Sequence, residues 1–285
     1  MYTSSEPIRA LLSIPHDEAC FTQGLVLDGD ILYESCGLYG KSSLRIVDPK
    51  TGSVIKKKRL HSRYFAEGIV LHDRKIYMLT WKNKALLVFD ANSLNLLETK
   101  SFSTYNGQGW GFTTDGKHFI ASDGSDTLTF FEPLQANQHT LTVVKHVKVT
   151  HPKTGKGIVN INELQYVDGF IYANVWFQDE VLRIDPSSGR VLETYDLSHL
   201  YPRRQRSPTA DVLNGIAYNP AEGSFLVTGK LWPQYYTVRL PLAAGSGSGS
   251  RGLQQQEQQQ GEYEEGDSVV DVSTLLSEGV SEVVV

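Results

Sequence analysis

A short phrase that recurs five times along the chain constrains its fold more than any other feature. In each copy a varying residue stands beside small or apolar residues, and an apolar alternating run, a tight turn and a second run follow. The varying residues are Gln23, Glu67, Trp110, Glu163 and Asn214, spaced by 44, 43, 53 and 51 residues. Self-similarity at such a period indicates a repeat architecture. Because a purely structural repeat would keep similar packing residues at this place, we interpret the changing residue as part of one convergent site.

Each repeat predicts four short strands. The second repeat shows the pattern most clearly, with apolar residues at every other position and turn residues between the runs. Its predicted strands are Ile69–Leu71, Lys75–Thr80, Leu86–Asp90 and Leu96–Phe102. Four-strand repeats of this length are typical of a β-propeller.

The strand count predicts how the ring closes. The fifth repeat supplies only three strands, and one further strand, Ile8–Ile14, precedes the first repeat. A propeller must close its ring, so we expect the N-terminal strand to complete the last blade. The sequence therefore predicts an all-β, five-bladed propeller that occupies residues 1–242.

The composition changes abruptly after Leu242. A Gly/Ser alternation at Gly245–Gly249 precedes a Gln-rich run at Leu253–Gln260 and an acidic run at Glu262–Asp267. Segments of this kind bury too little apolar surface to offset the entropy lost on ordering. We expect residues 243–285 to form a low-complexity, mostly disordered acidic tail, with its last, Val-rich part left open between a short strand and a helix.

The net charge of −5 is concentrated in the tail. Eight acidic residues and one basic residue follow position 242, which leaves +2 for residues 1–242. A near-neutral domain gives no electrostatic case for a nucleic-acid partner. No apolar stretch approaches the ~20 residues that span a bilayer, and the first residues lack the pattern of a signal peptide. We expect no membrane partner and a monomer, and the compartment stays open.

The cysteines and histidines limit the chemistry. Cys20 and Cys36 fall close together if Leu25–Leu27 pairs with Ile31–Tyr33, so a disulfide and two neighbouring reduced thiols both stay open. The histidines show no pair at metal-ligand spacing, which disfavours a zinc hydrolase, and we predict no metal site. No histidine accompanies either cysteine in the pattern, which disfavours a cysteine nucleophile.

The repeat pattern gathers other side chains near the varying residues. In a propeller the innermost strands surround a central channel, so positions at the start of those strands meet at one mouth. Side chains two residues earlier share that face of the strand, and the ends of the second strands return to the same mouth. These rules add Phe21, Phe65, Trp81, Trp176 and Lys230. Apolar walls with a few convergent polar groups predict a pocket for a small molecule or a peptide end. The alternatives are that Trp110 is core and that Glu67 accepts channel backbone amides.

Several motifs resemble one enzyme family. They are Phe21-Thr22-Gln23-Gly24-Leu25, Glu67-Gly68 with Thr80-Trp81, Gly109-Trp110-Gly111, Ile161-Asn162-Glu163-Leu164 and Leu213-Asn214-Gly215-Ile216. From about Pro7 to Leu240, in order and spacing, the chain resembles the plant and bacterial glutaminyl-peptide cyclotransferases. The resemblance implies a five-bladed propeller that converts the N-terminal Gln of peptides and proteins to pyroglutamate and releases ammonia. That family is unrelated to the zinc-dependent animal enzymes of the same activity.

The resemblance also implies roles for individual residues. Glu67 matches the carboxylate that carries the proton, and Asn162 and Lys230 match positions that hold the γ-carbonyl oxygen. The remaining matches line the substrate site: Phe21, Gln23, Phe65, Trp81, Trp110, Trp176 and, as a contact for the amine, Glu163. The reaction needs no redox cofactor. Some plant relatives carry a structural divalent ion such as calcium, but no ligand cluster in this sequence requires one.

Two other classes of function remain as alternatives. A non-catalytic scaffold propeller would bind peptides and release no ammonia, and it would tolerate loss of Glu67. A metal-dependent, lactonase-like hydrolase would need several channel carboxylates around an ion, and the ring of varying residues contains few. Ammonia release and its response to EDTA separate these three classes.

Overall fold

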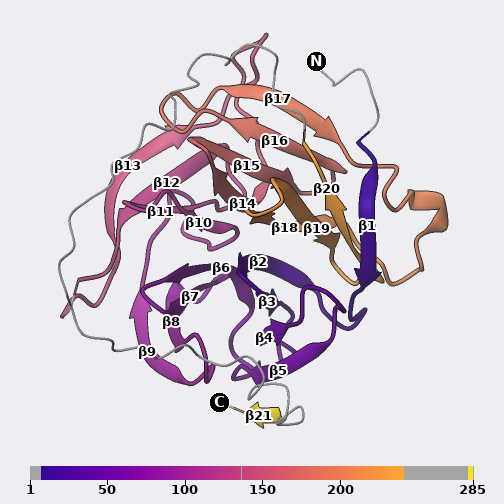
Figure 1. Ribbon diagram of the computed structural model, residues 1–285. Coiled ribbons are helices and arrows are strands. Elements are labelled where there is room, and N and C mark those ends of the chain that lie inside the picture. The colour runs from indigo at the N-terminus through magenta and orange to yellow at the C-terminus, as the bar shows by residue number, and fades with distance from the viewer. Residues whose placement is uncertain (1–7, 136, 241–281, 285) are drawn as a thin grey trace, which may run out of the picture.

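Five antiparallel sheets surround a central axis in the computed structural model, which describes residues 8–135, 137–240 and 282–284. Figure 1 looks along this axis and shows the sheets arranged as the blades of a propeller. Within the described residues the only helical element is a 3-10 turn at Arg203–Gln205, between β17 (Val191–Asp196) and β18 (Leu213–Asn219). The predicted five-bladed, all-β fold is confirmed.

Each blade contains four antiparallel strands. The first has β2 (Thr22–Asp28), β3 (Ile31–Cys36), β4 (Ser43–Val47) and β5 (Val54–Arg59). The second has β6 (Ala66–His72), β7 (Lys75–Thr80), β8 (Ala85–Asp90) and β9 (Leu96–Ser101). The third has β10 (Phe112–Thr114), β11 (Phe119–Ala121), β12 (Thr127–Glu132) and β13 (Thr142–Lys148). The fourth has β14 (Ile161–Val167), β15 (Phe170–Val175), β16 (Glu180–Ile184) and β17 (Val191–Asp196). The fifth has β18 (Leu213–Asn219), β19 (Ser224–Gly229), β20 (Gln234–Val238) and β1 (Ala10–Pro15).

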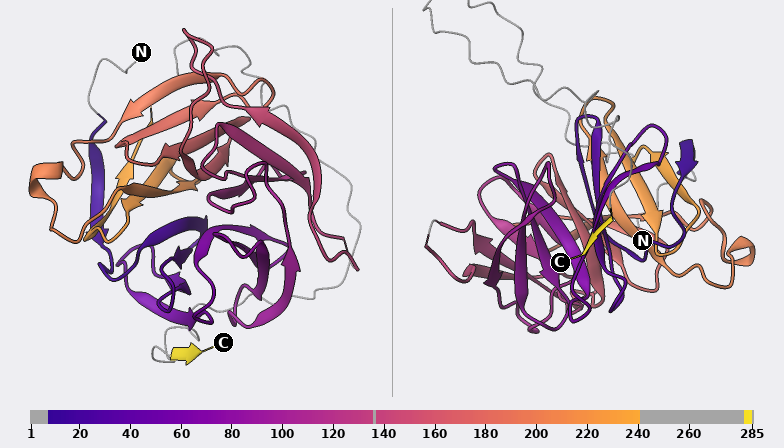
Figure 2. Two further views of the ribbon diagram at one scale, coloured as in Figure 1. Left: turned by 180° about the vertical axis from the view of Figure 1, so that it is seen from behind. Right: turned by 90° about the horizontal axis from the view of Figure 1, so that it is seen from below.

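The N-terminal strand closes the ring as predicted. It begins at Ala10, two residues after the predicted start at Ile8. β1 pairs antiparallel with β20, from Ala10 opposite Val238 to Pro15 opposite Gln234. It forms the outer edge of the fifth blade in both views along the axis (Figures 1 and 2). The first described strand is therefore held by the last strand of the repeats.

The repeated phrase coincides with a backbone irregularity. The innermost strands β2, β6, β14 and β18 each shift register against the second strand of their blade, for example between Thr22 and Gly24 and between Ala66 and Ile69. A β-bulge leaves a residue outside the ladder and redirects its side chain. The varying residues lie within these bulges, which explains why the position tolerates Gln, Glu and Asn without disturbing the sheet.

The third blade departs from this pattern. Its inner strand β10 begins only at Phe112, so Trp110 precedes the strand instead of lying at its start. Backbone hydrogen bonds still hold the tryptophan in the inner position, because its N–H donates to the Ser122 carbonyl and its carbonyl accepts from the Gly68 N–H. A Cβ on Gly68 would lie 2.4 Å from the Phe112 nitrogen, so glycine is required where these two blades meet.

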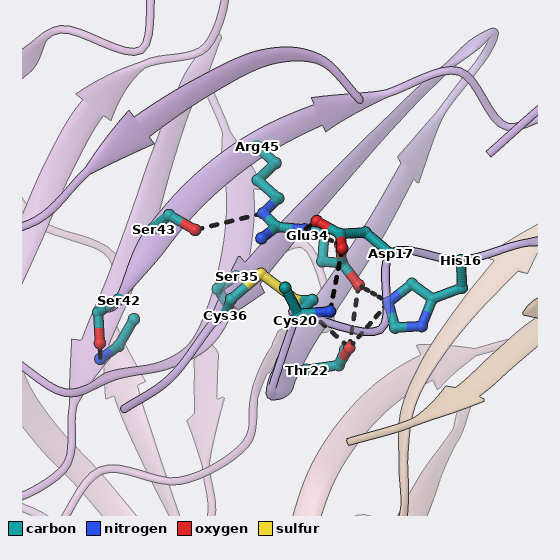
Figure 3. Close-up of a disulfide and its surroundings, with 12 residues drawn as sticks. His16, Asp17, Cys20, Thr22, Glu34, Ser35, Cys36, Ser42, Ser43 and Arg45 are labelled. Atoms are coloured by element: carbon teal, nitrogen blue, oxygen red, sulfur yellow. Dashed lines mark hydrogen bonds and ion pairs between the residues drawn. A yellow bond between two sulfur atoms is a disulfide. The ribbon is translucent and has the colours of Figure 1, made fainter. Parts of the chain in front are cut away.

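A disulfide joins the two cysteines whose state the sequence left open. Cys20 and Cys36 are bonded at 2.02 Å, and both are buried (Figure 3). Cys20 lies just before β2 and Cys36 ends β3, so the bond fastens the start of the innermost strand to its neighbour. The backbone N–H of Leu231 donates to the Cys20 carbonyl, which extends this support to the fifth blade.

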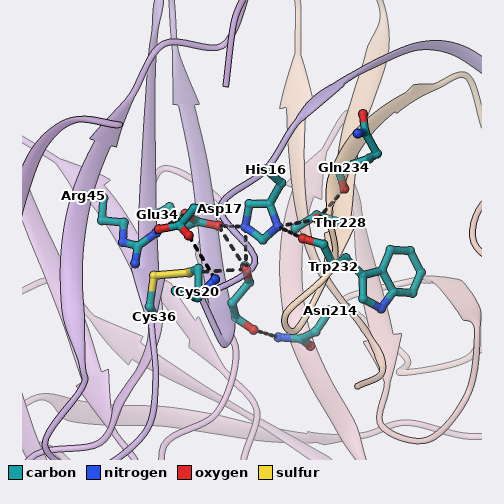
Figure 4. A network of polar contacts seen from close by, with 12 residues as sticks. His16, Asp17, Cys20, Glu34, Cys36, Arg45, Asn214, Thr228, Trp232 and Gln234 are labelled. Carbon is teal, nitrogen blue, oxygen red and sulfur yellow. Dashed lines mark hydrogen bonds and ion pairs between the residues drawn. A yellow bond between two sulfur atoms is a disulfide. The ribbon is translucent and has the colours of Figure 1, made fainter. Parts of the chain in front are cut away.

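A buried group of charged and polar side chains lies beside the disulfide, where the fifth blade meets the first. We call it the closure network, and its members are His16, Asp17, Thr22, Glu34 and Arg45. Figure 3 labels all five, and Figure 4 shows how His16 reaches the fifth blade. The His16 ring, next to the end of β1, lies 2.9 Å from Glu34 Oε1 and also contacts the Trp232 carbonyl. Because both partners are acceptors, both ring nitrogens donate. The network therefore ties the closing strand to the first blade through a charged histidine.

The chain beyond the propeller is described only in part. β21 (Glu282–Val284) pairs in parallel with β5 at the outer edge of the first blade. The rest of the predicted acidic tail lies outside the described residues. No helix within the described ranges combines the length and the apolar character needed to cross a bilayer.

Candidate active site

One end of the propeller axis, the mouth, collects the starts of the inner strands and the ends of the second strands. Four backbone hydrogen bonds place the second-strand ends there. The N–H groups of Gly37, Trp81, Trp176 and Lys230 donate to the carbonyls of Phe21, Phe65, Asn160 and Val212, at 2.8, 3.1, 2.8 and 2.9 Å. These equivalent bonds explain how residues from four blades converge. We call the predicted residues gathered at this end the mouth cluster: Phe21, Gln23, Phe65, Glu67, Trp81, Trp110, Asn162, Trp176 and Lys230.

Glu67 and Lys230 are two buried groups of opposite charge that interact electrostatically, and no hydrogen bond or ion pair joins them. Each residue is 4% exposed, and neither side chain donates or accepts a hydrogen bond within the described part of the chain. Burial raises the pKa of Glu67 well above its usual range, and the charge of Lys230 offsets only part of that rise. Burial likewise lowers the pKa of Lys230, against the opposing charges of Glu67, Asp211 and Glu163. No backbone amide of the channel donates to the Glu67 carboxyl group within the described residues. The alternative role of Glu67 as an amide acceptor is therefore not supported.

The amide side chains of the mouth are only partly used by the protein. Asn214 Nδ2 donates to the Thr22 carbonyl at 2.9 Å and to Gln23 Oε1 at 3.3 Å. This leaves the NH2 group of Gln23 without a partner among the described residues. Asn162 is 2% exposed at the start of β14, and its side-chain amide makes no hydrogen bond there either. Two buried amides are therefore free to bind a substrate.

Aromatic rings form a wall over the first and second blades. The rings of Phe21 and Phe65 meet edge to face at 6.2 Å, and Phe65 meets Trp81 at 5.5 Å. Lys230 Nζ lies 4.8 Å from the centre of the Phe21 ring, which joins the wall to the charged pair. A Cβ on Gly37 would lie 2.4 Å from Phe65, so the glycine makes room for this ring.

A second aromatic pair covers the third and fourth blades. Trp110 and Trp176 meet edge to face at 5.4 Å. Gly124, which has a positive φ of 78°, lies under Trp110, and a Cβ there would be 2.6 Å from the indole ring. Both tryptophans are half-buried, which makes them accessible walls and not core.

Glu163 lies deeper than the rest of the predicted site. It is fully buried, and its Oε1 accepts the backbone N–H of Leu25 from the opposite side of the ring at 3.2 Å. Burial raises its pKa well above the usual range, and the hydrogen bond from the Leu25 amide offsets only part of that rise. Its other oxygen, Oε2, has no partner in the described residues. The Glu163 side chain thus acts as a brace, a hydrogen-bonded link between β14 and β2 across the channel. Its contact with a substrate amine stays a prediction.

One group of potential metal ligands occurs within the described ranges, and it does not fit an ion. The ligand atoms of His16, Cys20 and Glu34 lie within 4.8 Å of one another. The Cys20 sulfur is bonded to Cys36, so it offers no thiolate, and the His16 ring is hydrogen-bonded to Glu34. Calcium prefers a set of oxygen ligands, which this group does not supply.

The structure adds residues that the repeat pattern did not single out. Tyr39 is 49% exposed and covers Phe65 at 5.4 Å, and Phe177 stacks on Trp176 at 4.0 Å. Gln108 accepts hydrogen bonds from two tryptophans of the cluster. A signal existed only for Gln108, which stands two residues before Trp110 as Phe21 and Phe65 stand before their varying residues.

Comparisons with known proteins agree with this geometry. Residues 3–240 match the family model described as glutamine cyclotransferase. The chain is 37% identical over 240 residues to a glutaminyl-peptide cyclotransferase of Arabidopsis thaliana, covering 83% of this chain and 72% of that protein. It also resembles the crystal structure of Myxococcus xanthus glutaminyl cyclase, with a TM-score of 0.71 and 33% identity over 82% of this chain and 98% of that one. With nearly the whole propeller matched in sequence and structure, the chain belongs to the glutamine cyclotransferase family.

Proposed function

We propose that this protein is a glutaminyl-peptide cyclotransferase in which Glu67 carries the proton. It converts the N-terminal Gln of a peptide or protein to pyroglutamate and releases ammonia. The observation that carries the proposal is a carboxyl group at the mouth that is 4% exposed, makes no hydrogen bond within the described residues and interacts electrostatically with Lys230. A buried carboxyl with a raised pKa is suited to both accept and return a proton near neutral pH.

The reaction is an exchange of one C–N bond for another. The neutral α-amine of the substrate attacks its own side-chain Cδ, and a new N–Cδ bond closes a five-membered ring. Glu67 takes one proton from the attacking nitrogen and returns it to the departing amide nitrogen. The old Cδ–N bond then breaks and ammonia leaves, so no proton is gained or lost overall and water is not consumed.

Asn162 and Lys230 stabilise the tetrahedral intermediate. As the amine attacks, negative charge develops on the γ-carbonyl oxygen. The Asn162 amide and the Lys230 ammonium are buried donors that the described protein residues do not occupy, so they are free to bind this oxygen. A positioned donor of this kind is worth roughly 3–4 kcal/mol in the transition state.

The aromatic walls orient the substrate and keep water out. An extended Gln side chain holds its carbonyl far from its own amine, so reaction requires a folded conformer. Flat rings on two sides of a narrow site favour that conformer, which lowers the entropic part of the barrier. Excluding water also prevents hydrolysis of the amide to Glu, the competing reaction at the same carbon. Gln23, held by Asn214, directs its free NH2 group to the substrate backbone.

We propose further that the enzyme acts as a monomer and without a metal ion. The chemistry above uses only an acid–base group and hydrogen-bond donors, and no step requires a Lewis acid. Activity that survives exhaustive EDTA treatment supports this mechanism, and activity that EDTA abolishes and calcium or zinc restores would favour the hydrolase alternative.

The direct test is incubation of the full chain with a Gln-initiated peptide. We expect stoichiometric ammonia release and a peptide mass lower by one ammonia. The same peptide with an acetylated N-terminus has no free amine to attack and should not react. Peptide binding without ammonia release would instead identify a scaffold propeller.

A further inference from the structure

We propose that Gln108 is a positioning residue that joins the two aromatic walls of the mouth into one surface. The proposal rests on the proposed function, because the surface it builds is the one that holds the substrate Gln. Gln108 lies in the segment between β9 and β10 and is half-buried. No hydrogen bond joins it to Glu67 or Lys230, and its effect on catalysis passes through tryptophans.

Two indole groups share one acceptor at this residue. The Nε1–H of Trp81 donates to Gln108 Oε1 at 2.6 Å, and the Nε1–H of Trp110 donates to the same oxygen at 3.2 Å. An amide oxygen offers two lone pairs, so these two bonds use its full capacity and fix the orientation of the amide plane. Each indole has a single donor, which makes Gln108 the complete hydrogen-bonding environment of both.

The two tryptophans belong to different aromatic groups. Trp81 packs on Phe65 at 5.5 Å, and Trp110 packs on Trp176 at 5.4 Å. No ring contact joins the first group to the second among the described residues. Gln108 is thus the polar link that fixes the spacing between the wall over blades one and two and the wall over blades three and four.

The repeat explains why a polar residue occupies this place. Counted from the varying residue of each phrase, Gln108 is equivalent to Phe21 and Phe65. In the first two blades the residues at this position contact each other ring to ring. In the third blade its neighbours are two indole N–H groups, which need an acceptor when they are partly buried. An aromatic residue there would leave both donors unpaired.

The backbone around Gln108 is itself held in place. Its carbonyl accepts the Thr104 hydroxyl at 2.6 Å, and the next N–H, that of Gly109, donates to the Trp81 carbonyl at 3.0 Å. A Cβ on Gly109 would lie 2.7 Å from Phe102, so the chain passes too closely for any other residue. A side chain on an anchored backbone can hold two rings at a fixed separation.

The test compares three substitutions. Gln108→Met keeps the length of the side chain and removes the acceptor, and we expect KM for a Gln-initiated peptide to rise about tenfold to a hundredfold, with a smaller change in kcat. Gln108→Glu keeps an oxygen acceptor and should recover KM to within about threefold of wild type. Gln165→Met, in β14, replaces a half-buried glutamine outside the mouth and should leave both constants unchanged.

A second readout does not depend on activity. Near-ultraviolet circular dichroism reports the fixed environment of tryptophan side chains. Without substrate, the Gln108→Met spectrum should lose tryptophan bands that Gln108→Glu retains. If Gln108→Met fails to fold, Gln108→Asn, which keeps the amide but shortens its reach, should show the same losses.

The outcomes separate this inference from the proposed function. Wild-type KM and a wild-type tryptophan spectrum in Gln108→Met would overturn the positioning role, as would equal impairment of folded Gln108→Met and Gln108→Glu. A wild-type enzyme that forms no pyroglutamate would overturn the function. The spectra would still decide whether Gln108 holds the two indoles.

Discussion

Two buried carboxylates, Glu34 in the closure network and Glu67 in the mouth cluster, show how differently this fold treats negative charge. Glu34 is fully buried, yet the His16 ring lies 2.9 Å away and the Thr22 hydroxyl donates at 3.0 Å. Burial alone would raise its pKa, but the His16 charge and hydrogen bond, with Arg45 and Thr22, hold that pKa below its usual range. Glu67 is almost as buried, has no such donors, and its pKa is raised.

The difference teaches that partners, and not burial, separate a structural charge from a reactive one in this protein. Glu34 is held in its ionised state by the His16 ring at Oε1 and the Arg45 guanidinium near Oε2, although Oε2 makes no hydrogen bond within the described residues. Glu67 has no such contacts among the described residues, which leaves it available for the proton exchange that we propose. Glu163 lies between the two cases, since a neutral backbone N–H donates to one of its oxygens but no charged side chain is paired with it within the described ranges.

The largest expected effect comes from Glu67→Gln, which removes the proton carrier at constant shape. We expect kcat to fall about 10²-fold to 10⁴-fold, while the free energy of unfolding is unchanged or increased, because a buried carboxyl that makes no hydrogen bond is lost. Steady-state ammonia release and urea unfolding measure the two quantities. Glu132→Gln, at the exposed end of β12, is the control. A kcat equal to wild type would end the proposed mechanism.

Glu34→Gln breaks the closure network, so we expect it to lower stability and to leave catalysis intact. Leaving His16 without its carboxylate, and Arg45 with Asp17 alone, should cost about 3–5 kcal/mol of unfolding free energy, while kcat per folded molecule is retained. Because the folded pKa of Glu34 is lowered, its contribution is present above the unfolded pKa and is lost as pH falls through the folded value.

The titration of His16 sets the upper limit of the pH range in which the closure network stabilises the fold. Although burial alone would lower its pKa, the Glu34 charge and hydrogen bond raise it, so its contribution is lost as pH rises through the folded value. The stability difference between wild type and Glu34→Gln should therefore be greatest between the two titrations. A difference independent of pH would contradict the network's role.

Lys230→Met tests whether Glu67 and Lys230 are electrostatically coupled. Loss of a donor should lower kcat about 10²-fold to 10³-fold. Because the charge of Lys230 lowers the pKa of Glu67, its removal should also move the limb of the kcat–pH profile that reports Glu67 to higher pH. A limb that keeps its position would mean that the two groups titrate independently.

The smallest expected effect is that of the Cys20→Ser, Cys36→Ser double variant. The bond closes a loop with a sequence separation of 16 residues, for which chain entropy predicts a loss of about 3 kcal/mol. Thermal unfolding with and without reductant measures it, and wild type in reductant should approach the variant. Equal stability of all samples would show that the closure network alone holds this corner.

The sequence predicted the fold and most of the site because both follow from one repeat. The phrase located Gln23, Glu67 and Trp110 without any contact information, and strand alternation added Phe21 and Phe65. The same rule missed Gln108, because a glutamine does not stand out where aromatic residues are being sought.

Other features depend on contacts that no local pattern carries. His16 and Glu34 meet only because β1 pairs with the fifth blade beside the first. The brace formed by Glu163 depends on how far its side chain reaches across the channel to Leu25. The bulges that aim the varying residues are backbone irregularities, and a regular period-two pattern gives no sign of them.

The pairing of β1 with β20 also dictates an order of events during biosynthesis. β1 emerges from the ribosome before any blade, but its partner is the last propeller strand to be made. The first four blades can each form from neighbouring segments as they appear, whereas the fifth must wait and then recapture a strand made at the start. Until then the outer edge of β20 is uncovered and His16 lacks the Trp232 carbonyl. Capture of β1 by β20 is thus the step that completes the propeller.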